Sequence, residues 1–254
     1  MSSVRDTGRA AGTERAPDGL VLEARNVCRS FPSGDRTLEV LRGVDVELRA
    51  GEIVAVLGPS GSGKSTLLHC LGGLDRPTAG TIRIGGQDLA SQDDGQLAAI
   101  RNREVGFVFQ FHHLLPDFSA VENVMLPQMI AGVSSSRARE RAEQLLGEVG
   151  LAERLDHAPG ELSGGEQQRV AVSRALANRP SVVLADEPSG NLDVASSASL
   201  HDLLDGLRRE HGVTFLIATH DLDLAGKADR VLTVADGRLV AGTAPGAAPQ
   251  GAAR

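Results

Sequence analysis

The chain has no tryptophan and no tyrosine, and only two of its 26 basic residues, Lys64 and Lys227, are lysines. Its two cysteines, Cys28 and Cys70, are too few for a disulfide scaffold or a cysteine-rich zinc site, which favours a reducing compartment. Acidic residues outnumber basic ones and give a formal net charge of −7. This balance argues against a protein that binds nucleic-acid phosphates.

Long apolar segments are also missing. No run approaches the roughly 18–20 apolar residues that cross a bilayer, so we expect an intracellular chain whose membrane role comes only through a partner. Residues 1–19 lack the apolar stretch of a secretory signal. They and residues 241–254 offer little to bury, which predicts two disordered tails around a folded region at 20–240. An apolar content of 41% is enough to build a core there.

Between the tails, short β-rich runs alternate with helical ones, which predicts an α/β fold with a mainly parallel sheet. The first runs alternate apolar and polar residues, as antiparallel strands do, whereas later runs are continuously apolar, as buried parallel strands are. From about 111 to 160 the pattern becomes helical, and Ser119 and Glu122 form a capping-box pattern there. We expect strands at 20–27, 44–48, 53–57, 81–84, 105–109, 182–185, 213–218 and 231–234, and helices at 64–71, 137–149, 166–178 and 194–209.

A glycine-rich turn follows the expected strand at 53–57 and precedes a helix. It matches the pattern G-x-x-x-x-G-K-[ST], in which backbone N–H groups surround phosphate oxygens and the helix N-terminus adds positive potential. Lys64 supplies a charge for the β- and γ-phosphates, and the hydroxyl of Ser65 is placed to bind Mg²⁺. The pattern therefore predicts a nucleoside-triphosphate site formed by Gly58, Pro59, Ser60, Gly61, Ser62, Gly63, Lys64, Ser65 and Thr66.

Two acids, Asp186 and Glu187, follow another apolar run, at the strand end where an open parallel sheet binds its ligands. We expect Asp186 to hold Mg²⁺, directly or through water. Glu187 is the candidate that orients and deprotonates an attacking water, a role worth typically ~10²–10⁴-fold in rate. Because no acceptor site other than water is evident, the pair favours a hydrolase over a kinase.

The segment from Leu162 to Arg169, LSGGEQQR, fits two explanations. Ser163 and Glu166 match a capping box for the helix that follows. Capping leaves the adjacent Gly164 and Gly165 unexplained, because glycine in the first turn weakens a helix. Bare backbone at a helix N-terminus instead favours the close approach of an anion.

The LSGGEQQR segment matches the signature motif of the ATP-binding cassette superfamily, which the sequence resembles over about residues 20–240. The family's other motifs occur in order, with Gln110 at the Q-loop position, Ser189–Asp193 at the D-loop and His220 at the switch histidine. Phe31 lies where many relatives have a tyrosine that stacks on adenine. The resemblance implies a P-loop NTPase, RecA-like α/β fold: a mainly parallel sheet with an N-terminal antiparallel β subdomain and an inserted α-helical subdomain at about 111–160.

The resemblance also implies how such a site works, with ATP and Mg²⁺ as its cofactors. Two copies form a head-to-tail dimer, and ATP at the P-loop of one copy is contacted in trans by Ser163, Gly164, Gly165 and Asp193 of the other. The implied metal ligands are Ser65, Gln110 and Asp186. The implied catalytic residues are Glu187, His220 and Lys64. The activity implied is ATP hydrolysis coupled to transport.

The stretch Gln110–Phe118 (QFHHLLPDF), with Leu68–Asp75 and Val121–Val124, is most similar to the lipoprotein-releasing LolD-type ATPases. This resemblance implies integral membrane permease subunits of the LolC/LolE type, contacting Gln110–Phe118 at the cytoplasmic face of the inner membrane. We expect Phe107 and Phe109 to lie in the core, and the residues 112–115 to line a groove on the surface.

Three functions stay open on the sequence alone. They are lipoprotein release, export of peptides or hydrophobic drugs by a MacB-type cassette, and FtsE-type regulation of cell-wall enzymes, all within one group of cassettes. A DNA-repair cassette is disfavoured, because the spacing between the P-loop and the LSGGEQQR segment leaves no room for the long insertions of that class.

Overall fold

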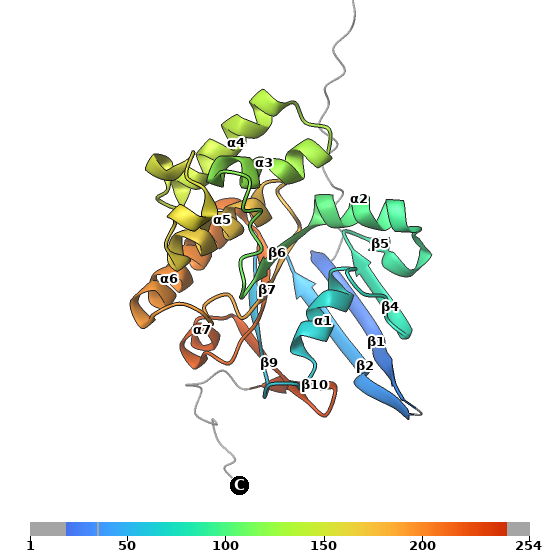
Figure 1. The fold of residues 1–254 in the computed structure, drawn as a ribbon. Coiled ribbons are helices and arrows are strands. Elements are labelled where there is room, and N and C mark those ends of the chain that lie inside the picture. The colour runs from blue at the N-terminus through green and yellow to red at the C-terminus, as the bar shows by residue number, and fades with distance from the viewer. Residues whose placement is uncertain (1–18, 35, 243–254) are drawn as a thin grey trace, which may run out of the picture.

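The computed structural model describes residues 19–34 and 36–242, so the predicted tails lie almost wholly outside the described residues. Figure 1 shows the arrangement of the elements. The strands are β1 (Leu20–Ser33), β2 (Arg36–Arg49), β3 (Ile53–Leu57), β4 (Ala79–Ile84), β5 (Gln87–Asp88), β6 (Val105–Phe109), β7 (Val182–Asp186), β8 (Thr214–Ala218), β9 (Arg230–Ala235) and β10 (Arg238–Gly242). The α-helices are α1 (Lys64–Leu71), α2 (Asp94–Glu104), α3 (Ala120–Ile130), α4 (Ser135–Glu148), α5 (Gly164–Leu176), α6 (Val194–His211) and α7 (Leu222–Gly226). Short 3₁₀ turns are formed by Leu89–Ser91, Ala152–Arg154 and Pro159–Glu161.

The larger sheet has the strand order β10-β9-β3-β8-β7-β6. Its neighbouring strands are parallel, apart from β10, which pairs antiparallel with β9. The first four residues of β3 and of β7 and all five of β8 are buried. Strands covered on both faces must be apolar throughout, which explains the continuous apolar runs that predicted them.

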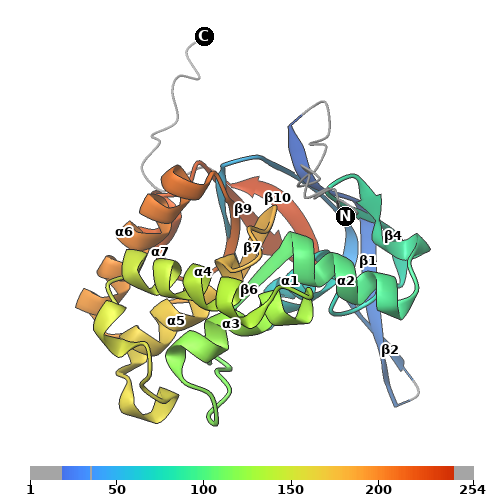
Figure 2. The same ribbon diagram turned by 90° about the horizontal axis from the view of Figure 1, so that it is seen from above.

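Alternate residues of these strands face two separate cores, because successive side chains point to opposite faces of a sheet. Ile53 and Phe215 pack in one core with α3, α4, α5 and α6. Val54 and Leu216 pack in the other with α1, β1, β2 and β4. Seen from above, α3–α6 gather on one side of the molecule and β1, β2 and β4 on the other (Figure 2).

The smaller sheet is antiparallel, with the order β2-β1-β4-β5. Its long hairpin agrees with the predicted antiparallel unit, but β1 runs on to Ser33 and β2 begins at Arg36, well past the predicted ends. The residues near the hairpin tip are mostly exposed, so no apolar alternation marks them in the sequence. Backbone pairing between the two strands carries the hairpin beyond the core.

The helical segment predicted at about 111–160 contains α3 and α4, which pack against α5. Ser119 caps α3 as predicted: its N–H donates to Glu122 Oε2 at 2.9 Å, and its Oγ accepts from the Glu122 N–H at 3.4 Å. The helix predicted at 137–149 begins two residues earlier, at Ser135. Over residues 19–34 and 36–242, no helix has the length and apolarity needed to span a bilayer.

The sequence did not predict α2, α7 or β10. Of the 11 residues of α2, only Leu97, Ile100 and Glu104 are buried, too few for a clear apolar stripe. A capping box between Asp93 and Gln96 is the signal that would have found it. Strand β10 reaches Gly242, so residues 241 and 242, expected in the C-terminal tail, pair with β9.

Asn123 is a fully buried polar residue that holds the loop before α3. Its Oδ1 accepts from the Leu115 N–H at 2.8 Å. Its Nδ2 donates to the carbonyl oxygens of Leu115, Phe118 and Ser119 at distances between 3.0 and 3.1 Å. One side chain therefore satisfies several backbone groups of the loop.

Replacing Asn123 by alanine leaves those backbone groups without partners where water has little access. Since an unsatisfied buried polar group costs ~1–3 kcal/mol, we expect N123A to lower the free energy of unfolding by about 2–3 kcal/mol in urea denaturation. Q144A, on the exposed surface of α4, is the matched control and should change it by less than about 0.5 kcal/mol. Equal losses in both variants would contradict this role of Asn123.

Candidate active site

The predicted phosphate loop connects β3 to α1. Gly61 and Gly63 have φ angles of 78° and 106°, a region that side chains with a Cβ rarely adopt. A Cβ at Gly63 would also lie 3.2 Å from the carbonyl oxygen and from Cγ1 of Val40. Both the positive φ angle and the lack of space for a Cβ therefore require glycine at Gly63. Without a side chain there, the loop can lie close to β2 just before α1 begins.

Lys64, the first residue of α1, is only 8% exposed. Its Nζ donates to the carbonyl oxygens of Gly58 at 2.8 Å and Pro59 at 3.2 Å, and lies 3.9 Å from Glu187 Oε1. The ammonium group is thus folded back across its own loop. Because burial of a charge is costly unless it is paired, this position favours an anionic ligand.

The two predicted acids lie at the end of β7. Asp186 is the last residue of the strand, and Glu187 follows with φ of 46°, uncommon for a residue with a side chain. Glu187 Oε2 accepts from the backbone N–H of His220 at 3.2 Å and lies 2.9 Å from His220 Nδ1. Since an ionised carboxylate only accepts, the ring donates from Nδ1. Glu187 is therefore held between His220 and Lys64.

A cavity of about 650 Å³ joins these groups. Its lining combines the loop, α1 and one residue of β2 with residues at or just after the ends of β6, β7 and β8: Val40, Ser60, Gly61, Gly63, Lys64, Ser65, Thr66, Gln110, Asp186, Glu187 and His220. Ser65, Gln110 and Asp186, the predicted metal ligands, all line it. Hydroxyl, amide and carboxylate oxygens are the ligands that Mg²⁺ prefers, so the donor set fits this ion.

Other predicted site residues do not line the cavity. Gly58, Pro59 and Ser62 are absent from its lining, and the carbonyls of Gly58 and Pro59 hold Lys64. A Cβ at Gly58 would meet Ser62 Oγ at 2.7 Å and the Val234 carbonyl oxygen at 2.8 Å. The residues expected to act in trans are also outside the cavity of a single chain: Ser163, Gly164, Gly165 and Asp193.

Phe31, the predicted adenine platform, lies near the tip of the β1–β2 hairpin. The guanidinium carbon of Arg29 lies 4.3 Å from the centre of its ring. Arg29 is fixed in turn by two 2.7 Å hydrogen bonds to the carboxylate of Asp75. One face of the ring is thus covered by the guanidinium of Arg29, and Phe31 does not line the cavity beside the phosphate loop.

Ser163 and Glu166 form the predicted capping box at the start of α5. Glu166 Oε2 accepts from the backbone N–H and from Oγ of Ser163, both at 2.8 Å, and these bonds lower the pKa of Glu166 to about 2. Gly164 and Gly165 have negative φ angles, and a Cβ at either would come no closer than 3.6 Å to another atom. Nothing among the residues that the structure describes therefore requires glycine at these positions.

The segment Gln110–Phe118 is anchored by Arg174 of α5. The guanidinium donates to the carbonyl oxygens of His112 at 2.8 Å and His113 at 2.7 Å, and burial lowers the pKa of Arg174. Phe111 is 67% and Leu115 43% exposed, whereas Leu114 is partly buried against the core. Leu115 therefore lies on the surface as expected of 112–115, and Leu114 contributes to packing.

Phe107 and Phe109 are only partly buried. Their rings stack with centres 5.6 Å apart, and Phe107 packs against the core that contains α1. Both line a cavity of about 250 Å³ between β6, α3 and α5. The expectation that both are core residues is therefore only partly correct. Phe107 packs against the core, but both rings also line this cavity.

Two contributors to the active site were not predicted. Val40, from β2, lines the cavity, and no sequence motif marks it. Asn191, inside the segment Ser189–Asp193, forms hydrogen bonds with Gln110. Its position within the predicted D-loop, Ser189–Asp193, is the sequence feature that marks Asn191 as a candidate site residue.

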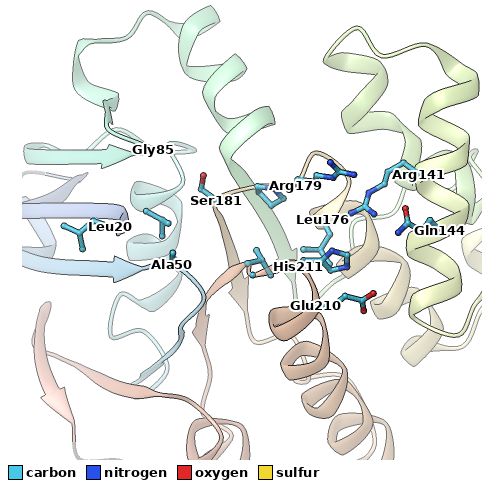
Figure 3. Close-up of a pocket in the computed structure, with 14 residues that line it drawn as sticks. Leu20, Ala50, Gly85, Arg141, Gln144, Leu176, Arg179, Ser181, Glu210 and His211 are labelled. Carbon is cyan, nitrogen blue, oxygen red and sulfur yellow. The ribbon is translucent and has the colours of Figure 1, made fainter. Parts of the chain in front are cut away.

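A second large cavity, of about 480 Å³, lies at the opposite ends of the parallel strands (Figure 3). Arg141 of α4 and Arg179, which follows α5, both line it, and burial followed by the charge of Arg179 lowers the pKa of Arg141. Nearby, His211 Nε2 lies 2.8 Å from Glu148 Oε2 and joins α6 to α4. None of the predicted site residues lines this cavity.

Comparison with known proteins places these observations in a family. The ABC transporter family matches residues 41–190. The lipoprotein-releasing system ATP-binding protein LolD of Geobacter metallireducens is 52% identical, covering 87% of this chain and 98% of that protein. LolD of Maricaulis maris is 56% identical, covering 87% and 96%.

A solved structure of the ATP-binding cassette MJ0796, a dimer in a post-hydrolysis state bound to ADP and Pi, is 38% identical with a TM-score of 0.79. The likeness covers 86% of this chain and 96% of that one. Together with the two sheets and the loop between β3 and α1, these matches confirm the predicted family and P-loop NTPase fold. The chain therefore belongs to the ABC transporter family, as an ATP-hydrolysing cassette.

Proposed function

We propose that two copies of this chain hydrolyse Mg²⁺-ATP at their interface and drive integral membrane permease subunits that release lipoproteins from the inner membrane. The observation that carries the proposal is the convergence of Lys64, Glu187 and His220 on one cavity beside the phosphate loop. The curated relatives named LolD favour lipoprotein release over the sibling functions. The proposed location is the cytoplasmic face of that membrane.

The chemistry follows from the groups that line the cavity. Lys64 and the loop N–H groups bind the triphosphate, and its oxygens replace the carbonyl partners that Lys64 now has. Bound Mg²⁺ would neutralise charge that builds on the phosphates, held by Ser65, Gln110 and Asp186. Glu187 accepts a proton from the attacking water, and His220 keeps the carboxylate facing the loop.

A second copy of the chain supplies further contacts to the bound ATP, from the N-terminus of its α5. Ser163 and Gly164 are exposed at the N-terminus of α5, where the N–H groups of the first helical residues have no intrahelical carbonyl partner. Such a terminus favours an anion, and two glycines that no neighbour in residues 19–34 and 36–242 requires make close approach possible. The dimeric state of the related cassette MJ0796 supports this arrangement. We therefore assign Ser163, Gly164, Gly165 and Asp193 to the ATP of the partner copy.

The proposed permease contact is the segment Gln110–Phe118. It begins at a predicted metal ligand, exposes Phe111 and Leu115, and is fixed to α5 by Arg174. A partner helix seated there would thus be connected with the nucleotide site through Gln110 and with the Ser163 end of α5.

The variant E187Q tests the assignment of the base. Glutamine keeps the shape of the side chain but cannot accept the water proton, so kcat should fall at least ~10²-fold while ATP still binds. Size-exclusion chromatography with Mg²⁺-ATP should then show an accumulated dimer. The exposed Glu153→Gln is the control and should keep normal turnover. Normal turnover by E187Q would contradict the proposal.

The two lysines of the chain make a matched pair of variants. K64A removes the charge that faces the phosphates, so ATP affinity measured by calorimetry should fall at least about tenfold and turnover should be lost. K227A removes an exposed lysine that pairs with Asp202, and both quantities should stay normal. Unchanged ATP affinity in K64A would refute the phosphate-loop assignment.

Leu115 tests the permease contact. With LolC- and LolE-type subunits in lipid nanodiscs, L115A should reduce lipoprotein-stimulated ATP turnover several-fold, because an exposed apolar contact is lost. Basal turnover of the isolated chain should be unchanged. V240A, at an equally exposed site on β10, should affect neither rate. A loss of basal turnover in L115A would instead assign Leu115 to folding.

A further inference from the structure

Two amides join loops that lie 81 positions apart in the sequence. Asn191 Nδ2 donates to the backbone carbonyl oxygen of Gln110 at 3.0 Å. Gln110 Nε2 donates to Asn191 Oδ1, also at 3.0 Å. The side chain of Asn191 therefore binds both the backbone and the side chain of one residue.

Donor and acceptor rules fix the orientation of both amides. The backbone carbonyl of Gln110 can only accept, so Asn191 must direct its NH₂ group to it. Asn191 then offers its oxygen to the side chain of Gln110, and an oxygen can be met only by the NH₂ end of that amide. As a consequence, Oε1 of Gln110 takes no part in the hydrogen bonds with Asn191.

The loop that carries Asn191 is itself tied to the end of β7. The N–H of Gly190 donates to the Glu187 carbonyl oxygen at 3.0 Å, and the N–H of Leu192 donates to that of Ser189 at 3.0 Å. A Cβ at Gly190 would lie 3.0 Å from Gln110 Nε2 and 3.3 Å from Gln110 Cδ. The Gln110 amide is thus packed directly over this turn, next to the strand that ends in Asp186.

The free Oε1 matters because Gln110 lines the nucleotide cavity together with Ser65 and Asp186. Mg²⁺ binds amide oxygen and not amide nitrogen, so a rotated Gln110 would present two N–H donors to the cation. We infer that Asn191 is a positioning residue, which holds the Gln110 amide with its oxygen toward the metal. This inference rests on the proposed function, in which Gln110 is a metal ligand.

The test is the effect of Mg²⁺ on nucleotide affinity, which needs no turnover. Calorimetry with the non-hydrolysable analogue adenylyl imidodiphosphate, in Mg²⁺ and in EDTA, gives the ratio of the two dissociation constants. Partners that orient a metal ligand typically contribute ~10–100-fold in metal affinity. We therefore expect N191A to reduce the ratio about tenfold, with the affinity in EDTA unchanged.

Two further variants separate positioning from simple loop stability. S196A, in α6, removes the 2.7 Å hydrogen bond from Ser196 Oγ to Asp193 Oδ2 at the end of the loop that carries Asn191, and should leave the ratio unchanged. N191D keeps an acceptor for Gln110 Nε2, so it should retain more of the Mg²⁺ effect than N191A.

An unchanged ratio in N191A, or an equal loss in N191A and S196A, would overturn the inference. If the unmodified chain itself does not bind the analogue, the proposed function fails, which is a different result. Circular dichroism of each variant shows that it is folded.

Discussion

The register of the parallel sheet is the constraint on which the active site depends. Phe109 pairs with Asp186, and Asp186 pairs with Ala218, so β6, β7 and β8 end level with one another. The next residues, Gln110 and Glu187, therefore lie beside each other although they come from distant parts of the sequence. The strands hold this register because their side chains are buried on both faces, where a shift by one residue would exchange every contact between the two cores.

The strand register brings two charged side chains, Lys64 and Glu187, into the same cavity. Lys64 is nearly buried, and its present partners are two backbone carbonyls and a carboxylate 3.9 Å away. Glu187 is held from its other side by His220. The cavity thus contains a cation and an anion that are close but not in contact. In the proposed function, a triphosphate gives Lys64 stronger, charged partners and leaves Glu187 free to bind water.

Much of this architecture could be predicted from the sequence, and the failures have physical causes. The helix Lys64–Leu71 and the strands at 53–57 and 105–109 have the predicted limits, because apolar runs and the glycine-rich loop mark their ends. Only three residues of α2 are buried, and Arg238 and Val240 of β10 are exposed, so periodicity does not reveal these elements. The bonds between Asn191 and Gln110 were out of reach because they depend on strand register, which no local pattern contains.

Helix α5 connects the proposed dimer interface with the proposed permease contact. Its N-terminus carries Ser163 and the two glycines, and near its other end Arg174 holds the carbonyls of His112 and His113. Thirteen residues of α-helix form a rigid rod roughly 20 Å long. Arg174 has no carboxylate partner among the described residues, so its attachment to this segment depends on those two carbonyls. If ATP on a second copy displaces the Ser163 end of α5, we expect the proposed permease contact to move with it, because one continuous helix and the two hydrogen bonds of Arg174 connect them.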